Sequence, residues 1–441
     1  MDTSGYQEIF GAPFWNEGNS HEVHAFVAGV NSIGNLLQLE IEILSASSFA
    51  ANYETHREPI SLFESIRACL AIMKLEEVAA RKIFGLGEDE PIEGSWRTFR
   101  IVANGQSDGQ ELRLLTSFAD TEGQVFKIMD IREIPPEVAE SHLTMILGSE
   151  VGEDDVRSLI NPVVKRELEL AVLDVGQGAA SFLFIKNGDR HFPVIYFDLG
   201  GGIAKNAFTF PTSGVDWCFT QNPPVILSHW HWDHWAGATY GSVANVSKAL
   251  KATWLAPNQT TGSFTNKFKA KILKAGGRIF YWPASKSHLT IGRITLGIAS
   301  GTLTNDSGLV LLLQDNDKRY SLLPGDAEYI YIPNAIQEKY KNGLKTLVIT
   351  HHGGKHGTPV NIPAPDGKGG NHAIYSVGGS NSYGHPTRLN DYSAWVCVGT
   401  HQRNKLKVKH LCATTGGAGS GVVNPICGGR GNPNCSLILH K

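Results

Sequence analysis

The sequence predicts an α/β fold preceded by a smaller α+β domain. Several short apolar runs have the length of buried strands, and each ends in a histidine, an acid or glycines. In α/β folds, chemistry lies beyond the carboxyl ends of strands, where these polar residues stand. The first 160 residues instead combine one helical pattern with strand patterns separated by Gly/Asp turns. We therefore predict an acidic α+β domain over 1–160 and the α/β domain over 161–441.

Within the first domain, residues 61–84 show helical spacing of apolar side chains, with Ser61 as a candidate N-cap. The segments 98–103, 112–117 and 125–131 have the composition of strands. No motif in this domain points to a chemistry. We expect an architectural support or a surface for a protein partner.

The segment 228–234 (SHWHWDH) concentrates three histidines and one aspartate directly after an apolar run. Read as H-x-H-x-D-H, it offers two metal positions. His229 and His231 alternate and can reach one ion, while Asp233 and His234 turn toward a second. Imidazole and carboxylate are the ligands that zinc, manganese or iron prefer at an open hydrolytic site. The alternative is a surface patch of histidine and tryptophan.

Four further apolar runs deliver similar residues at their ends. One ends at Asp198 and three glycines, one at Asp326, and one at His351 and His352, while His385 follows the last. Five strand ends of this kind favour a single site assembled from distant parts of the chain.

These motifs resemble those of the metallo-β-lactamase-fold hydrolases, most of all the hydrolase domain of DNA-uptake competence proteins. Across roughly residues 167–400 they are LDVGQG (173–178), FDLG (197–200), the HxHxDH cluster, NDS (305–307), GD (325–326), HHG (351–353) and YGHP (383–386). The resemblance implies an αββα sandwich, in which two mixed sheets face each other with helices outside and metals at one edge.

The resemblance also implies roles for the residues. His229 and His231 would hold the first metal, and Asp233 and His234 the second. Asp326 would bridge the two ions. The candidates for a further, distal ligand of the second ion are His351, His352 and His385.

Other residues would act outside the ligands. Asp198 would brace the histidine loop by hydrogen bonding, and Asp174 is assigned a similar supporting position. Many family members carry a histidine where this chain has 302–307 (TLTNDS), so the first site is either weak or recruits Asn305 or Asp306. The family's acid after Gly-Gln-Gly is Ala179 here. The number of metals stays open between one and two.

The expected chemistry is hydrolysis. A divalent ion such as zinc or manganese lowers the pKa of a bound water to about 7, which makes hydroxide available. Asp233 or Asp326 could accept the proton of the nucleophile. The sequence holds no G-x-S-x-G elbow and no cysteine in a recognisable catalytic motif. We expect a metal-dependent phosphodiesterase or nuclease. The alternatives are an ester, thioester or lactone hydrolase, and a catalytically weak component of a multiprotein system.

Charge is divided unequally along the chain. Residues 1–160 hold 27 acidic and 11 basic residues, a net charge of −16, whereas the rest hold 15 and 28, a net of +13. A basic catalytic domain favours anionic substrates, with nucleic acid and nucleotides as the candidates.

Two groups of residues are candidates for substrate contact. Lys267, Lys269 and Lys271 lie in a basic amphipathic pattern that could contact phosphates. A solvated helix face explains the pattern equally well. Trp230 and Trp232 could stack a base or sugar. Packing around the metal pocket is the favoured alternative for both.

The chain is expected to be cytoplasmic, without a membrane anchor. No apolar run approaches the roughly 20 residues that span a bilayer. The first 24 residues carry acids and no lysine or arginine, unlike a secretory signal. The six cysteines form no C-x-x-C pair, which favours a reducing compartment. Cys412, Cys427 and Cys435 lie in a glycine-rich tail, where a small metal or disulfide clip is the alternative.

Overall fold

The computed structural model describes residues 20–400 with short gaps, so the three tail cysteines lie outside the described part. The gaps are 54, 57, 104–108, 116, 118–119, 121, 145–146, 165, 188–189, 211–214, 216 and 241–242. The chain forms two compact units. The first comprises Met1–Gly148 and Thr260–Lys274, and the second Ser149–Gln259 and Ala275–Lys441.

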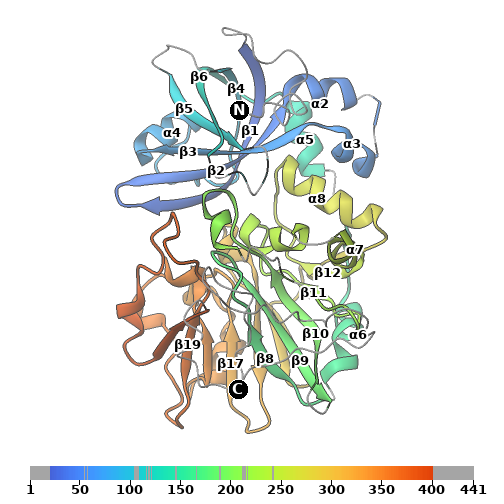
Figure 1. The fold of residues 1–441 in the computed structure, drawn as a ribbon, viewed down its shortest axis with the longest axis vertical. Helices are drawn as coiled ribbons and strands as arrows, with labels where there is room; N and C mark the ends of the chain where they lie inside the picture. The colour runs from blue at the N-terminus through green and yellow to red at the C-terminus, as the bar shows by residue number, and fades with distance from the viewer. Residues whose placement is uncertain are drawn as a thin grey trace. The chain divides into compact units, whose positions relative to one another are not determined.

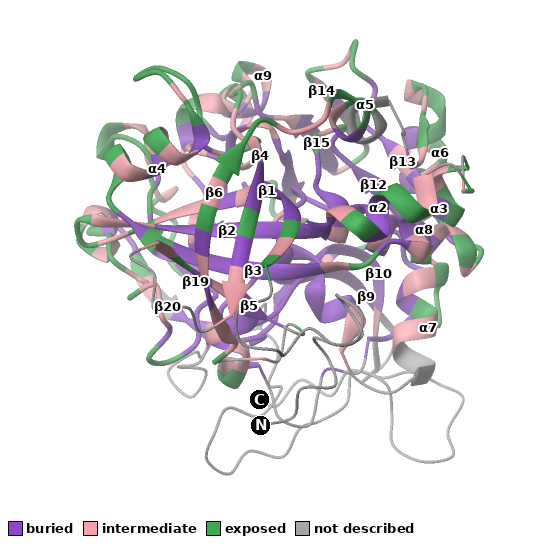
Figure 2. Cartoon of the chain, turned by 90° about the horizontal axis from the view of Figure 1, so that it is seen from above, coloured by how far each residue is buried: buried purple, intermediate pink, exposed green. Residues whose placement is uncertain are grey.

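The first unit is built on a closed antiparallel barrel with the strand order β1-β2-β3-β5-β6-β4 (Figure 1). The strands are β1 (Ser20–Ile33), β2 (Leu36–Ser45), β3 (Ala68–Leu75), β4 (Trp96–Ala103), β5 (Gln110–Leu115) and β6 (Gln124–Arg132). Alternate side chains such as Val23, Ala25 and Ile41 join one apolar core, as the two-residue period of a strand requires. β2 and β3 are buried along most of their length (Figure 2).

Helices complete the first unit, and one of them comes from the middle of the chain. They are α2 (Ala46–Tyr53), α3 (Pro59–Ser65), α4 (Glu77–Phe84), α5 (Pro136–Thr144) and α8 (Ser263–Lys274). Ala270 of α8 shares a small apolar core with Leu44, Phe63 and Leu147. The predicted helix over 61–84 is wrong, because α3 ends at Ser65 and strand β3 follows it. The three predicted strands correspond to β4, β5 and β6.

The second unit contains two seven-stranded sheets (green and orange in Figure 1). The first has the order β7-β13-β12-β11-β10-β9-β8 and the second runs from β14 to β20 in sequence order. The first comprises β7 (Ser149–Glu150), β8 (Glu169–Val172), β9 (Ala180–Asn187), β10 (Arg190–Leu199), β11 (Val225–Ile226), β12 (Thr253–Ala256) and β13 (Arg278–Tyr281). The second comprises β14 (His288–Ile291), β15 (Ile294–Ile298), β16 (Leu309–Gln314), β17 (Tyr320–Leu323), β18 (Thr346–Val348), β19 (His372–Tyr375) and β20 (Val396–Gly399).

The two sheets pack face to face. Phe197 and Ile226 of the first sheet belong to the same apolar core as Leu311 and Leu323 of the second. A separate core on the other face of the second sheet contains Ile336 of α9 (Asn334–Gln337). Helices α6 (Glu153–Val164) and α7 (Val243–Lys251) also belong to this unit. The expected sandwich of two mixed sheets is thus present.

The direction of the strands determines where the polar residues that follow them lie. β10, β11, β12 and β13 run parallel in the first sheet, as do β17, β18, β19 and β20 in the second. Carboxyl ends of parallel strands lie at the same edge of a sheet, where ligands bind in α/β folds. The apolar runs of the sequence correspond to β10, β11, β17, β18 and β19.

The division of the chain differs from the predicted boundary at 160/161, which falls inside α6. The structure divides the chain after Gly148 and assigns Thr260–Lys274 to the first unit. That unit then holds 23 acidic and 14 basic residues, a net charge of −9. The second holds 19 and 25, a net of +6, so its basic character is weaker than the sequence suggested. Among the described residues, no helix is long and apolar enough to cross a bilayer.

Candidate metal centre

The histidines and acids of the second unit converge on Asp326, which follows β17. Its Oδ1 lies 3.3 Å from His234 Nε2. Its Oδ2 lies 3.7 Å from His351 Nδ1, 3.9 Å from His352 Nε2 and 4.0 Å from His229 Nε2. One carboxylate therefore faces imidazoles from two separate loops, which is the arrangement a bridging ligand requires.

Asp233 forms a second point of convergence. Its Oδ2 lies 3.2 Å from His352 Nε2, and its Oδ1 lies 3.8 Å from His234 Nε2. Two overlapping groups could each hold a metal ion: His229, His234 and Asp326, and Asp233, His234 and His352. The ligand atoms of each group lie within 4.8 Å of one another.

These separations fit a metal. Two ligands about 2.0–2.1 Å from a tetrahedral zinc ion lie roughly 3.3 Å apart. The contacts of 3.2 and 3.3 Å match that value, and those of 3.7–4.0 Å are slightly wider. His231 belongs to the same cluster, because its ring centroid lies 4.6 Å from that of His229.

The imidazoles near Ser228 are held through their Nδ1 atoms. Asp198 Oδ2 accepts a hydrogen bond from His234 Nδ1 at 2.9 Å, and both Asp198 oxygens accept from Ser228, through its backbone N at 2.7 Å and its Oγ at 2.8 Å. Ser228 Oγ also lies 3.0 Å from His229 Nδ1. Because Nδ1 carries the donated proton, the Nε2 lone pair of each ring remains available to a metal.

His352, on the loop after β18, is also held through its Nδ1 atom. Its Nδ1 donates to the Ser376 carbonyl at 2.9 Å. The Nε2 atoms of His229, His234 and His352 are buried and have no hydrogen-bond partner. Buried polar atoms are normally hydrogen-bonded. Three orphaned nitrogens that face two carboxylates therefore fit a divalent ion well.

Both carboxylates are ionised. Burial alone would raise the pKa of Asp326, but the charges of His234, His352 and His351 hold that pKa well below its usual value. Burial opposes ionisation of Asp233 too, yet the charges of His234 and His352 lower its pKa to about 2. Burial lowers the pKa of His234, but the surrounding carboxylates outweigh it and raise that pKa well above its usual value. The cluster therefore presents two carboxylates as acceptors only.

The glycine-rich segments after β8 and β10 hold the backbone of the histidine motif at 229–234 in place. The Asp233 carbonyl accepts hydrogen bonds from Ala179 N at 3.1 Å and Gly201 N at 3.2 Å. A Cβ on Gly200 would lie 1.7 Å from that carbonyl oxygen, so only glycine fits there. Asp174 accepts a hydrogen bond from Gly176 N at 3.5 Å and so shapes this glycine loop.

The loop after β18 has an unusual backbone. His351 and His352 both adopt the left-handed conformation, with φ values of 48° and 54°. Residues other than glycine rarely adopt this backbone conformation. Thr350 Oγ1 donates to the Ala327 carbonyl at 2.8 Å, and the Gly353 carbonyl accepts hydrogen bonds from the backbone N–H groups of Thr387 and Arg388, which directly follow the YGHP motif. These contacts hold both imidazoles in the cluster.

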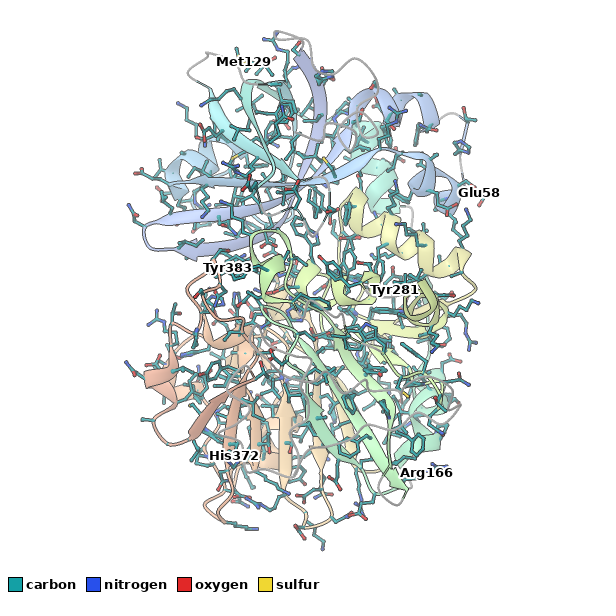
Figure 3. All side chains as sticks on the ribbon, in the orientation of Figure 1. Glu58, Met129, Arg166, Tyr281, His372 and Tyr383 are labelled. Carbon is teal, nitrogen blue, oxygen red and sulfur yellow. The ribbon has the colours of Figure 1, made fainter. Side chains whose placement is uncertain are left out.

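His385 lies beside the cluster rather than in either metal group. Its Nδ1 lies 3.4 Å from Gln177 Nε2, and its ring centroid lies 5.6 Å from that of His351. Burial, together with the charges of His351 and His352, lowers the pKa of His385 to about 3. The ring of Tyr383, which is labelled in Figure 3, lies 5.6 Å from His385. Among the three candidate distal histidines, His352 is the one in contact with Asp233.

The predicted contacts with substrate are not supported. Trp230 and Trp232 are only 2% and 0% exposed, and Trp230 Nε1 donates to the Pro257 carbonyl. Both pack in the interior, so neither can stack on a base.

The three lysines lie on α8 in the first unit. Lys269 is 3% exposed, and Lys267 Nζ donates to the Ile66 carbonyl at 3.2 Å. Lys271 alone of the three is exposed. The helix therefore does not offer the continuous basic face that a phosphate backbone would need.

Sequence reasoning missed Ser228, Ser376 and Gln177. Ser228 directly precedes the histidine motif, so its neighbours could have indicated it. Ser376 contributes its backbone carbonyl, which carries no sequence signal. Gln177 is one residue of the GQG motif, and only the folded loops bring it to His385.

Comparison with protein-family models and with curated proteins finds no match. Among solved structures, a protein of unknown function from Enterococcus faecalis is similar at a TM-score of 0.26 and 14% identity, over 48% of this chain and 54% of that one. The chain thus spans about half the length of that protein. A metallo-β-lactamase from Cronobacter sakazakii with a HARLDQ motif has a TM-score of 0.21 and 13% identity, over 39% and 74% of the chains.

A subclass B3 metallo-β-lactamase from a soil metagenome library has a TM-score of 0.19 and 15% identity, over 43% of this chain and 81% of that one. Scores this low carry no argument about function. The candidate metal centre stands on its own geometry.

Proposed function

We propose that the second unit is a metal-dependent hydrolase and that phosphodiesters are its substrates. The observation that carries the proposal is the convergence of orphaned imidazole nitrogens on Asp326 and Asp233. His229, His231 and Asp326 would hold one divalent ion. Asp233, His234, His352 and Asp326 would hold the other. Zinc and manganese both suit this set of ligands.

A bound divalent ion would supply a water of lowered pKa and positive charge for the leaving oxygen. The chain's own residues do the rest. The ionised carboxylates of Asp233 and Asp326 can accept the proton of the attacking water. Asp198, Ser228 and the Ser376 carbonyl keep the imidazoles oriented, so that little reorganisation is needed during the reaction.

The choice of phosphodiesters rests on the resemblance to competence-type hydrolases and on the net charge of +6 of the second unit. A positive field raises the local concentration of anionic substrates. The α8 lysines belong to the first unit, so they do not add to the positive charge near the metal centre. Hydrolysis of an ester, thioester or lactone therefore remains the second candidate.

The test is hydrolysis of bis(p-nitrophenyl) phosphate by the purified protein with manganese or zinc. Asp326→Asn removes the carboxylate on which the imidazoles converge, so turnover should fall by more than about 100-fold and metal content should drop. Asp154→Asn serves as the control, because Asp154 is exposed on α6.

A wild-type protein that binds either metal but shows no turnover would contradict the phosphodiesterase proposal. Carboxylic esters would then be assayed with the same two variants. Equal turnover by Asp326→Asn and the wild type would contradict the proposed centre itself.

A further inference from the structure

The two adjacent histidines after β18 both lie near Asp326, but their nearest carboxylates differ. His352 Nε2 lies 3.2 Å from Asp233 Oδ2. His351 instead directs its Nδ1 to Asp326 Oδ2 at 3.7 Å, and that same oxygen lies 4.0 Å from His229 Nε2. His352 Nε2 lies 3.9 Å from that oxygen too, but its nearer partner is Asp233, so His351 is the histidine of the pair that is left for the His229 side of Asp326.

The backbone explains how neighbouring residues reach two places. Both histidines are left-handed, and their rings are 6.4 Å apart at an interplanar angle of 68°. Two consecutive residues in this conformation bend the chain sharply. A single loop can thus direct one imidazole to each side of the shared carboxylate.

The segment without the family's histidine lies beside His351. Asn305 begins the short 3-10 helix η4 (Asn305–Ser307), and its Nδ2 lies 3.3 Å from His351 Nδ1. Its Oδ1 is buried without a hydrogen-bond partner. The segment is fixed next to the histidine motif, because Leu309 N donates to the Ser228 carbonyl at 2.7 Å.

We propose that His351, through Nδ1, is the third imidazole of the first metal position, in place of the histidine that 302–307 lacks. The proposal rests on the metal centre proposed above and adds a ligand to it. His229, His231 and His351 then supply three imidazoles to one ion, and Asp326 supplies the carboxylate shared with the other. Imidazole and carboxylate are ligands that zinc prefers, and expansion to five-coordination would leave a position for water.

Asn305 borders the proposed first metal position. Its Nδ2 lies 3.3 Å from His351 Nδ1, and because that nitrogen has one lone pair, a bound ion would take the place of the amide as its partner. An imidazole at position 305 would occupy the same neighbourhood. The third imidazole would thus come from the loop after β18, and not from the segment 302–307 where many family members carry it.

The experiment measures bound metal per chain by mass spectrometry after zinc loading and dialysis, together with calorimetric titration of the metal-free protein. The wild type should hold two equivalents and His351→Ala one. The double variant His351→Ala/Asn305→His should regain the second. His385→Ala is the matched control, since His385 neighbours both histidines but directs its Nδ1 to Gln177 rather than to a carboxylate, and it should keep two.

Circular dichroism of each variant shows whether it has folded, and the double variant tests the site even if His351→Ala alone is unstable. Two equivalents in folded His351→Ala would overturn the assignment of His351. So would a double variant that folds but does not regain the second equivalent. A wild-type protein that binds no metal would instead contradict the proposed function, so the two failures are distinguishable.

Discussion

Asp198 shows how much of the centre depends on a residue that would not touch the metal. It is fully buried and adopts a left-handed backbone conformation with φ of 63°. Burial raises its pKa, although the charge of His234 and the hydrogen bonds from His234 and Ser228 oppose that rise. A buried carboxylate with three hydrogen-bond donors fixes both the position and the tautomer of the ring it holds.

Asp198→Asn should lower zinc affinity by about 10–100-fold while the protein stays folded, because the amide cannot accept all three hydrogen bonds. Calorimetric titration measures the affinity, with Asp154→Asn as the reference. An affinity equal to that of the wild type would show that Ser228 and the backbone alone orient His234.

Gly354 is a second sensitive position. A Cβ there would lie 2.7 Å from His385 Nε2 and 3.0 Å from His351 Cδ2. Gly354→Ala should therefore displace the ring of His351, the proposed metal ligand, and lower turnover at saturating metal by at least about tenfold, since small misplacements in a catalytic centre are costly. Gly379→Ala is the matched control, because no atom lies within 4 Å of its Cβ position. Similar losses in both variants would indicate a general effect on folding.

At the scale of elements, α8 depends on a carboxylate from a distant strand. Glu42 Oε2 on β2 accepts hydrogen bonds from Phe264 N at 2.8 Å and Thr265 N at 3.2 Å, and its Oε1 accepts one from Thr265 Oγ1. A negative charge at the first turn of a helix satisfies unpaired N–H groups and favours the helix dipole. Lys269 lies buried on the same helix, with Nζ 2.8 Å from Thr261 Oγ1.

Lys269 should make stability depend on pH. Burial lowers its pKa from 10.5 to about 7, although Glu42 opposes the shift. The folded state therefore binds fewer protons than the unfolded state between these values, so stability rises with pH across that window. The cost of the buried charge is complete below about pH 7.

Lys269→Met removes this titration. The difference in thermal midpoint, variant minus wild type, should be most positive below pH 7 and should decline by about 3 °C or more toward pH 10.5. Lys271→Met, on the exposed side of α8, should show no such trend. A difference for Lys269→Met that stays constant with pH would contradict the prediction.

Elements with one clear signal could be predicted from sequence. β10, β11, β17 and β18 each contain a short apolar run that leads to a polar residue, and all four were predicted as strands. The segment 61–84 failed because its apolar positions suit a helix and a doubly buried strand alike. β3 is buried from Cys69 to Met73 without alternation, so periodicity alone cannot separate the two structures.

At the scale of the whole molecule, the metal residues could be predicted because each stands at a strand end and parallel strands bring those ends together. The distal histidine could not be chosen, because the choice between His352 and His385 depends on how two loops pack. The division of the chain was also hidden. Nothing in the composition of 260–274 distinguishes a helix of the second unit from one that belongs to the first.

The discontinuous first unit also sets an order of events during synthesis. All six barrel strands leave the ribosome before α8, which follows only after β7 to β12 of the other unit have been made. Until then, the apolar face around Leu44, Phe63 and Leu147 lacks its contact with Ala270. The nascent barrel must remain soluble with that face uncovered, and exposed apolar surface of this kind is what chaperones bind and what aggregates. Any truncation before α8 would make that temporary condition permanent.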